Sequence, residues 1–205
     1  RDRCGTLVYN PSDDEFSRQR LQLSQMLHAA ISSRQLSLWY QPQIDATTGR
    51  VCGLEALVRW EHPVDGLLSP AVFLPVARQA GLMAALSVEV ARQAVNDARR
   101  WRAIGITTPV AINLSPPELM SEAVLPQLYD MMARAGLPAD AILIEVTEDS
   151  FLADPDRARS VIEDVRRHGL EVSIDDYGTG FSSLSYLRDL PVQELKIDQS
   201  FITGL

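Results

Sequence analysis

The sequence predicts an α/β protein in which helices pack against a parallel sheet. Short, almost continuously apolar segments alternate with amphipathic helical segments along most of the chain. Parallel strands need long crossover connections and are usually covered on both faces, so repeated strand–helix units predict a parallel sheet. A doubly wound open sheet and a (β/α)8 barrel both fit this pattern.

The predicted elements follow from hydrophobic periodicity and from helix-start signals. An amphipathic helix is expected over roughly Glu15 to Ser32, and a longer one over Ala84–Arg102. Pairs or runs in which a capping residue precedes proline predict further helix starts at Ser69-Pro70, Ser115-Pro116-Pro117-Glu118 and Asp154-Pro155. The predicted strands are Leu36–Ile44, Val51–Arg59, Val110–Leu114, Ile142–Thr147, Val172–Asp175 and Glu194–Ile197.

The composition narrows the classes of function. The chain has 205 residues, 46% of them hydrophobic, which suits one domain with a sizeable core. A net charge of −8 argues against general binding to nucleic acid polymers. No apolar run approaches the ~20 residues of a membrane span, and no signal-peptide pattern is seen. We expect a cytoplasmic protein or the cytoplasmic part of a membrane-anchored one. The two cysteines give no disulfide framework, and Cys52 is expected in the core.

Polar residues interrupt the predicted strands near their C-terminal ends. Glu55, Leu57 and Arg59 share one face of their strand, because side chains alternate along a strand. A single acid at a strand end is usually solvated or caps the next helix. The recurrence of polar residues on several strands instead indicates a shared site at one end of the sheet, formed with Asn113, Glu145, Asp175, Asp176, Lys196 and Asp198.

These side chains predict a site for hard cations. Carboxylate and amide oxygens suit Mg²⁺ or Mn²⁺, and no Cys or His accompanies them, which argues against zinc. His62 and His168 are expected at the surface. The adjacent residues Asp175 and Asp176 could bridge two ions, the usual arrangement for cleaving a phosphodiester. Arg59 and Lys196 would then hold phosphate oxygens.

With these residues in view, the chain resembles the EAL domain of bacterial cyclic di-GMP phosphodiesterases from about residue 36 to residue 205. The resemblance rests on several motifs in the family's order: Tyr40-Gln41-Pro42, Glu55-Ala56-Leu57-Val58-Arg59-Trp60, Asn113-Leu114-Ser115, Glu145-Val146-Thr147-Glu148, Asp175-Asp176-Tyr177-Gly178-Thr179-Gly180 and Leu195-Lys196-Ile197-Asp198. It implies a modified TIM-type (β/α)8 barrel whose first strand is antiparallel to the rest.

The resemblance also assigns roles to individual residues. One Mg²⁺ or Mn²⁺ ion would be bound by Glu55, Asn113, Glu145 and Asp175, and a second would be shared by Asp175 and Asp176. Lys196 would hold a catalytic water or a phosphate, so that Glu55, Lys196 and Asp176 form the catalytic group. Glu148 would anchor the loop after Asp176. The residues expected to touch the substrate, cyclic di-GMP, are Gln41, Leu57, Arg59 and Asp198.

The C-terminal end departs from the family pattern. The family's seventh strand normally carries a further Glu in an Ala-Glu-Gly-Val-Glu-like segment, and an eighth strand carries a Gln-Gly motif. Neither is present before the chain stops at Leu205. We therefore expect residues 33–205 to be an EAL domain that lacks its last two strands, as a fragment of a longer domain or, alternatively, a natural truncation.

Residues 1–32 are expected to form a linker strand and helix. They resemble the end of a GGDEF diguanylate cyclase domain, although an ordinary N-terminal helix beside the barrel also fits. We expect a covalent link to GGDEF or sensor domains in the parent protein. The open edges of Leu36–Ile44 and Glu194–Ile197 should favour association, with a homodimer as the expected state.

Three functions remain open from the sequence. The first is metal-dependent hydrolysis of cyclic di-GMP to linear pGpG by attack of a metal-activated water. The second is an inactive EAL domain that acts as a cyclic di-GMP receptor. The missing seventh-strand Glu favours this function, and because that Glu is missing we expect poor turnover by residues 1–205. The third is a glycoside hydrolase that uses Glu145 and Glu148. Those residues lie three apart in a strand and would face opposite ways, which argues against it.

Overall fold

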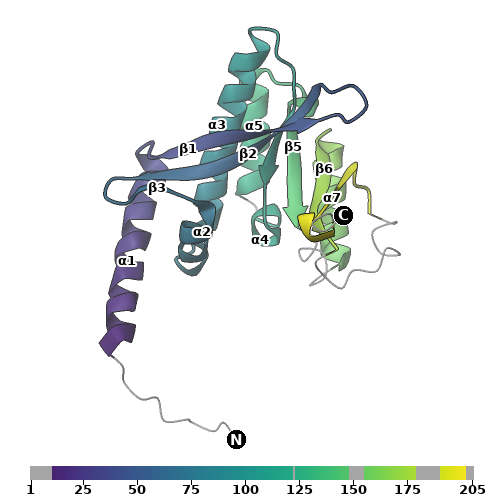
Figure 1. Cartoon of the computed structure of the whole chain (residues 1–205). Helices are drawn as coiled ribbons and strands as arrows, with labels where there is room; N and C mark the ends of the chain where they lie inside the picture. Colours follow the sequence, from purple (N-terminus) through teal and green to yellow (C-terminus); the bar gives the residue numbers. More distant parts are fainter. Residues whose placement is uncertain (1–10, 122, 148–154, 179–189, 202–205) are drawn as a thin grey trace, which may run out of the picture.

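The computed structural model describes residues 11–121, 123–147, 155–178 and 190–201 of the chain (Figure 1). Its strands form one seven-stranded sheet in the order β1-β2-β4-β5-β6-β7, with β3 paired to β2. The strands are β1 (Leu36–Ile44), β2 (Val51–His62), β3 (Gly66–Leu68), β4 (Val110–Asn113), β5 (Ile142–Thr147), β6 (Glu171–Tyr177) and β7 (Glu194–Ile197). The helices are α1 (Pro11–Ser32), α2 (Pro70–Gln79), α3 (Met83–Arg102), α4 (Pro116–Leu119), α5 (Val124–Ala135) and α7 (Pro155–Arg167).

The strand directions confirm the predicted fold class. β1 and β3 pair antiparallel with β2, and β2, β4, β5, β6 and β7 run parallel to one another. The antiparallel first strand implied by the family resemblance is therefore present. Within the described residues the sheet ends at β1 on one side and at β7 on the other, so those residues do not close a barrel.

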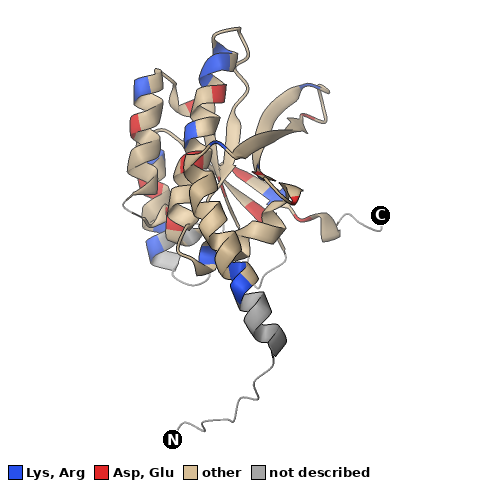
Figure 2. Cartoon of the chain, turned by 90° about the vertical axis from the view of Figure 1, so that its left-hand side faces the viewer, with Lys and Arg blue, Asp and Glu red and all other residues tan. Residues whose placement is uncertain are grey.

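One face of the sheet packs against the helices. In-register apolar residues on four neighbouring strands are almost completely buried: Ala56, Ile112, Ile144 and Val172. The helices lie on one side of the sheet, as Figure 2 shows, and their buried residues complete a single core. Because side chains alternate along a strand, the residues next to this apolar row point to the opposite face. That face carries the candidate site.

Local sequence explains where the helices begin and end. Glu118 accepts a hydrogen bond from the backbone N–H of Ser115 at 3.0 Å and another from its hydroxyl, so the predicted capping interaction is present at α4. α5 ends at Gly136, which adopts a left-handed conformation with φ 65°. α1 packs into the core through Leu27 and Ala30, which are fully buried. No helix among the described residues is both long and apolar enough to cross a membrane.

Three predictions about the β2 region were wrong. β2 continues past the predicted end at Arg59 to His62, because β3, which was not predicted, pairs with its last residues. Cys52 is exposed rather than in the core, since the β1–β2 hairpin end extends beyond the helices (Figure 1). His62 is buried rather than at the surface; its ring packs edge-on against Trp60, and its Nδ1 lies 2.9 Å from a carboxylate oxygen of Asp65.

Candidate active site

The sheet register brings the predicted polar residues together. Asn113, Glu145 and Ser173 are aligned on β4, β5 and β6, so their side chains share the face away from the helices. Asp175 lies two residues beyond Ser173 on the same face. Glu55 is aligned with Ala111, two residues before Asn113, and its side chain reaches forward to accept a hydrogen bond from the Asn113 amide at 3.0 Å.

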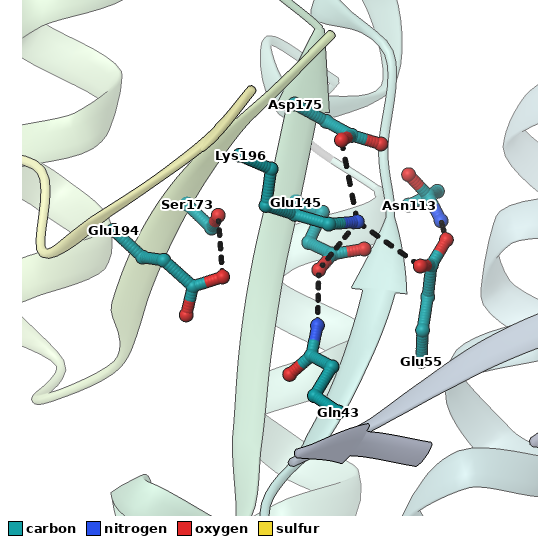
Figure 3. A network of polar contacts seen from close by, with 8 residues as sticks. All are labelled: Gln43, Glu55, Asn113, Glu145, Ser173, Asp175, Glu194 and Lys196. Atoms are coloured by element: carbon teal, nitrogen blue, oxygen red, sulfur yellow. Dashed lines mark hydrogen bonds and ion pairs between the residues drawn. The ribbon is translucent and has the colours of Figure 1, made fainter. Parts of the chain in front are cut away.

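Lys196 stands at the centre of these groups (Figure 3). Its Nζ lies 3.0 Å from Glu55 Oε2, 3.2 Å from Glu145 Oε1 and 3.3 Å from Asp175 Oδ1. One oxygen from each of the three carboxylates falls within 4.8 Å of the others. The three acids come from β2, β5 and β6 and the lysine from β7. Side chains that are up to 141 residues apart in the chain therefore meet at one point.

Burial governs the charge of the central carboxylate. Glu145 is fully buried, and this burial, together with the neighbouring charge of Glu55, raises the pKa of Glu145 to about 7. The Lys196 ammonium opposes that rise. Burial acts to lower the pKa of Lys196, but the surrounding carboxylates outweigh it and hold the lysine charged well above its ordinary range. The site thus concentrates negative charge around one cation, as the red and blue segments on the strands indicate (Figure 2).

A backbone irregularity separates Asp176 from this group. The β6–β7 register shifts between Ile174 and Tyr177, and Asp176 has a φ of 55°, which few residues other than Gly, Asn and Asp adopt. Asp176 is exposed and does not belong to the three clustered carboxylates. Partial burial and the charges of Asp175 and Asp198 nevertheless raise its pKa.

The remaining predicted residues occupy varied positions. Gln41 is exposed on β1 opposite Glu55. The Arg59 guanidinium donates to the Val58 carbonyl at 2.9 Å and lies 5.9 Å from the ring centroid of Trp39. The Ser200 side chain, together with the Ser200 N–H that donates to Asp198 at 2.8 Å, lowers the pKa of Asp198. Glu148 and most of the loop after Asp176 lie outside the described residues.

A mainly apolar cavity of about 280 Å³ lies beside the acidic cluster. Its lining from the strands and the segment after β4 comprises Ala56, Leu57, Val58, Asn113, Leu114, Ser115 and Thr147, and helices α2, α3 and α4 contribute the rest of its wall. Leu57 and Asn113 are thus shared between the cavity and the predicted site. The clustered carboxylates and Lys196 do not line this cavity, so it is a separate, mainly apolar space that adjoins the predicted site through Leu57 and Asn113.

Sequence reasoning missed Gln43. Its Nε2 lies 3.3 Å from Glu145 Oε1, the same oxygen that Lys196 contacts (Figure 3). Gln43 follows Gln41 by two residues on β1, so strand alternation places both on the face that carries the site. The family motif drew attention to Gln41 alone, and only the antiparallel pairing with β2 would have indicated Gln43.

The donor set fits a divalent cation. The clustered oxygens are carboxylates, which suit Mg²⁺ and Mn²⁺. Glu145 Oε2 is buried and has no hydrogen-bond partner among the described residues. A buried carboxylate oxygen without a partner is unfavourable by roughly 1–3 kcal/mol or more, and a metal ion would supply the missing contact. Glu55, Glu145 and Asp175 are thus the residues that could hold it.

A protein-family model for the EAL domain matches residues 24–205. The chain belongs to the EAL domain family. This finding confirms the family resemblance that the motifs indicated. It also places the C-terminal part of α1, from residue 24, within the matched region.

Relatives in the EAL family include enzymes named for cyclic di-GMP. A cyclic di-GMP phosphodiesterase of Pseudomonas aeruginosa is 38% identical over 207 residues, covering 100% of this chain and 35% of the relative. The bifunctional diguanylate cyclase/cyclic di-GMP phosphodiesterase MucR of the same organism is 37% identical over 99% of this chain and 30% of its own length. The chain therefore spans about a third of these curated relatives.

A solved structure of an EAL protein supports the fold. The structure described as the PaMucR phosphodiesterase in complex with c-di-GMP superposes with a TM-score of 0.84 at 39% identity. The match covers 88% of this chain and 74% of that one. The chain therefore shares its fold with a barrel-like EAL domain.

Proposed function

We propose that this EAL domain hydrolyses cyclic di-GMP to linear pGpG. The observation that carries the proposal is the meeting of Glu55, Glu145 and Asp175 within 4.8 Å around Lys196. Relatives that are 37–38% identical bear the name of this activity. Hydrolysis adds one water across one phosphodiester, breaks one P–O3′ bond and leaves a 5′-phosphate and a 3′-hydroxyl.

In this proposal a divalent cation is bound by Glu55, Glu145 and Asp175, with Asn113 beside them. Asp175 and Asp176 would be ligands of a second ion. Partial burial and the negative charges of Asp175 and Asp198 raise the pKa of Asp176, and a bound cation would offset the repulsion between these charges. When bound, such ions lower the pKa of a water and neutralise charge on a phosphate. Mg²⁺ and Mn²⁺ are both compatible with oxygen ligands.

The chain's own side chains would orient the substrate and balance its charge. The Lys196 ammonium shares the carboxylates with any incoming cation, and two cations cannot occupy the same space. Lys196 must therefore give up some of its contacts when an ion binds, which would free its donors for a water or a phosphate oxygen. Arg59 offers a planar fork suited to phosphate, and Gln41 and Leu57 extend from the same side of β1 and β2.

The proposal is tested by incubating an intact version of the EAL domain with cyclic di-GMP and MnCl₂ and separating the products by liquid chromatography. We expect pGpG as the product, with loss of turnover in Glu55→Gln and in the presence of EDTA. Glu61→Gln, an exposed acid on the same strand, is the matched control and should retain activity. Wild-type turnover in EDTA, or full turnover by Glu55→Gln, would contradict the mechanism.

The alternative function as a receptor gives a different result in the same experiment. A receptor would bind cyclic di-GMP, as detected by calorimetry, without producing pGpG at any Mn²⁺ concentration. If wild type binds cyclic di-GMP without turning it over, and Arg59→Ala no longer binds it, the protein is a receptor and the enzyme proposal is wrong.

The proposal extends to the assembly of the protein. We propose that the domain belongs to a longer polypeptide with GGDEF or sensor domains, as the bifunctional name of MucR suggests for that relative. We also propose a homodimer, because the β1 and β7 edges are unpaired among the described residues and carry exposed Trp39, Ile44 and Ile197. Light scattering measures the mass directly, and a monomer at micromolar concentration would contradict the dimer.

A further inference from the structure

The floor of the acidic cluster holds an amide that the proposed catalytic group does not include. Gln43 extends from β1 beneath the site, and its Nε2 donates to Glu145 Oε1 at 3.3 Å (Figure 3). Lys196 contacts the same oxygen at 3.2 Å. Both donors therefore hold Oε1 of Glu145, while Oε2 stays buried and has no partner among the described residues.

The orientation of the Gln43 amide follows from chemistry. If its oxygen faced Glu145, two acceptors would oppose each other, which is unfavourable in a buried place. The orientation with Nε2 toward the carboxylate gives a hydrogen bond to a charged acceptor, a stronger interaction than one between neutral groups. The Gln43 amide therefore holds Oε1 of Glu145 in a fixed position.

The backbone around Gln43 leaves room for this side chain. Gly53 is its direct partner on β2, and a Cβ at Gly53 would collide with Gln43 Oε1 and lie 3.1 Å from Gln43 Cδ. Gly53 has no left-handed backbone that would require glycine for another reason. The β1–β2 register also shifts between Gln43 and Ile44, and such irregularities redirect side chains next to functional sites. The local structure thus admits the Gln43 amide beneath the cluster.

We propose that Gln43 is a positioning residue that fixes the Glu145 carboxylate so that Oε2 faces the metal site. Gly53 supports this role by leaving the space that the Gln43 side chain fills. The inference rests on the proposed function, because it assumes that Glu145 is a metal ligand. Partners of metal-binding side chains typically change metal affinity by about 10- to 100-fold when they are removed. The hydrogen bond from Gln43 is long, so we expect about a 10-fold effect.

The test measures Mn²⁺ binding by calorimetry in wild type, Gln43→Ala, Gly53→Ala and the double variant. Gln43→Ala and Gly53→Ala should each weaken Mn²⁺ binding by about 10-fold. The double variant should be no weaker than Gln43→Ala, because the added Cβ has no amide left to displace. Gln127→Ala, an exposed glutamine on α5, is the matched control and should bind as wild type. Unfolding midpoints show whether a variant is merely less stable. A loss of stability alone would leave the Mn²⁺ affinity of the folded protein unchanged.

Two results have different meanings. Unchanged Mn²⁺ affinity in Gln43→Ala, with weakened binding in Glu145→Gln, would overturn the role of Gln43 and leave the proposed metal site intact. Unchanged affinity in Glu145→Gln would overturn the metal site itself. If Gln43→Ala does not fold, Gly53→Ala decides, since it retains the Gln43 side chain and only moves it. Wild-type affinity in folded Gly53→Ala would then contradict the proposal.

Discussion

Glu145 makes the stability of the metal-free protein depend on pH. Its pKa rises from an ordinary 4.5 to about 7 because the carboxyl is buried beside Glu55. Between these two values the folded protein holds a proton that the unfolded chain has released. Unfolding free energy therefore decreases as the pH rises from 4.5 to 7, and the contribution of Glu145 is constant outside this window.

The size of the effect follows from the shift. Each tenfold change in proton affinity corresponds to about 1.4 kcal/mol, so the shift of Glu145 corresponds to about 3 kcal/mol of unfolding free energy. Glu145→Gln has almost the same shape and cannot ionise. Between pH 4.5 and pH 8, the unfolding free energy of wild type should therefore fall by about 3 kcal/mol relative to that of Glu145→Gln.

Urea unfolding in EDTA at several pH values between 4.5 and 8 measures this difference. Glu61→Gln, exposed on β2, serves as the control and should follow the wild-type curve. Added Mn²⁺ should then stabilise wild type, because a ligand that binds only the folded state raises its unfolding free energy, but should stabilise Glu145→Gln less. Parallel pH curves for wild type and Glu145→Gln would refute the buried, shifted carboxyl.

Three further substitutions test separate parts of the structure. Tyr40→Phe removes a 2.7 Å hydrogen bond to Asp97 and should lower the unfolding free energy by about 1–3 kcal/mol in urea; an unchanged value would show that the bond is not formed. Gly136→Ala puts a side chain at a φ of 65° and should lower the unfolding free energy by about 1 kcal/mol. A stabilised variant would contradict the left-handed end of α5. Arg59→Lys should raise KM for cyclic di-GMP and change kcat little, because lysine lacks the bidentate fork; an unchanged KM would remove Arg59 from substrate binding.

The parts of the fold that could be predicted are those set by local pattern. Alternating apolar strands and amphipathic helices have characteristic periods, so β5 and β7 were placed at their observed bounds. β3 has only three residues, too few for a period to be detected, and it forms because the end of β2 offers an unpaired partner. Cys52 and His62 were misjudged because burial depends on which distant elements cover a residue.

The candidate site divides in the same way. Glu55, Asn113, Glu145 and Asp175 could be named because each is a polar residue in an apolar strand, an exception visible in the sequence. The backbone irregularity at Asp176 could not, since no local pattern predicts a positive φ within a strand. Gln43 could not be assigned either, because its contact with Glu145 spans 102 residues and depends on sheet register.

A crystal of the protein soaked in MnCl₂, with anomalous diffraction data, tests the central claim most directly. The account predicts an anomalous peak bonded to carboxylate oxygens of Glu55, Glu145 and Asp175, at about 2.0–2.2 Å as is usual for small divalent cations. It also predicts that Lys196 Nζ will have moved from at least one of its present contacts. Saturating Mn²⁺ without a peak there, and with Lys196 still bound to all three carboxylates, would contradict the account.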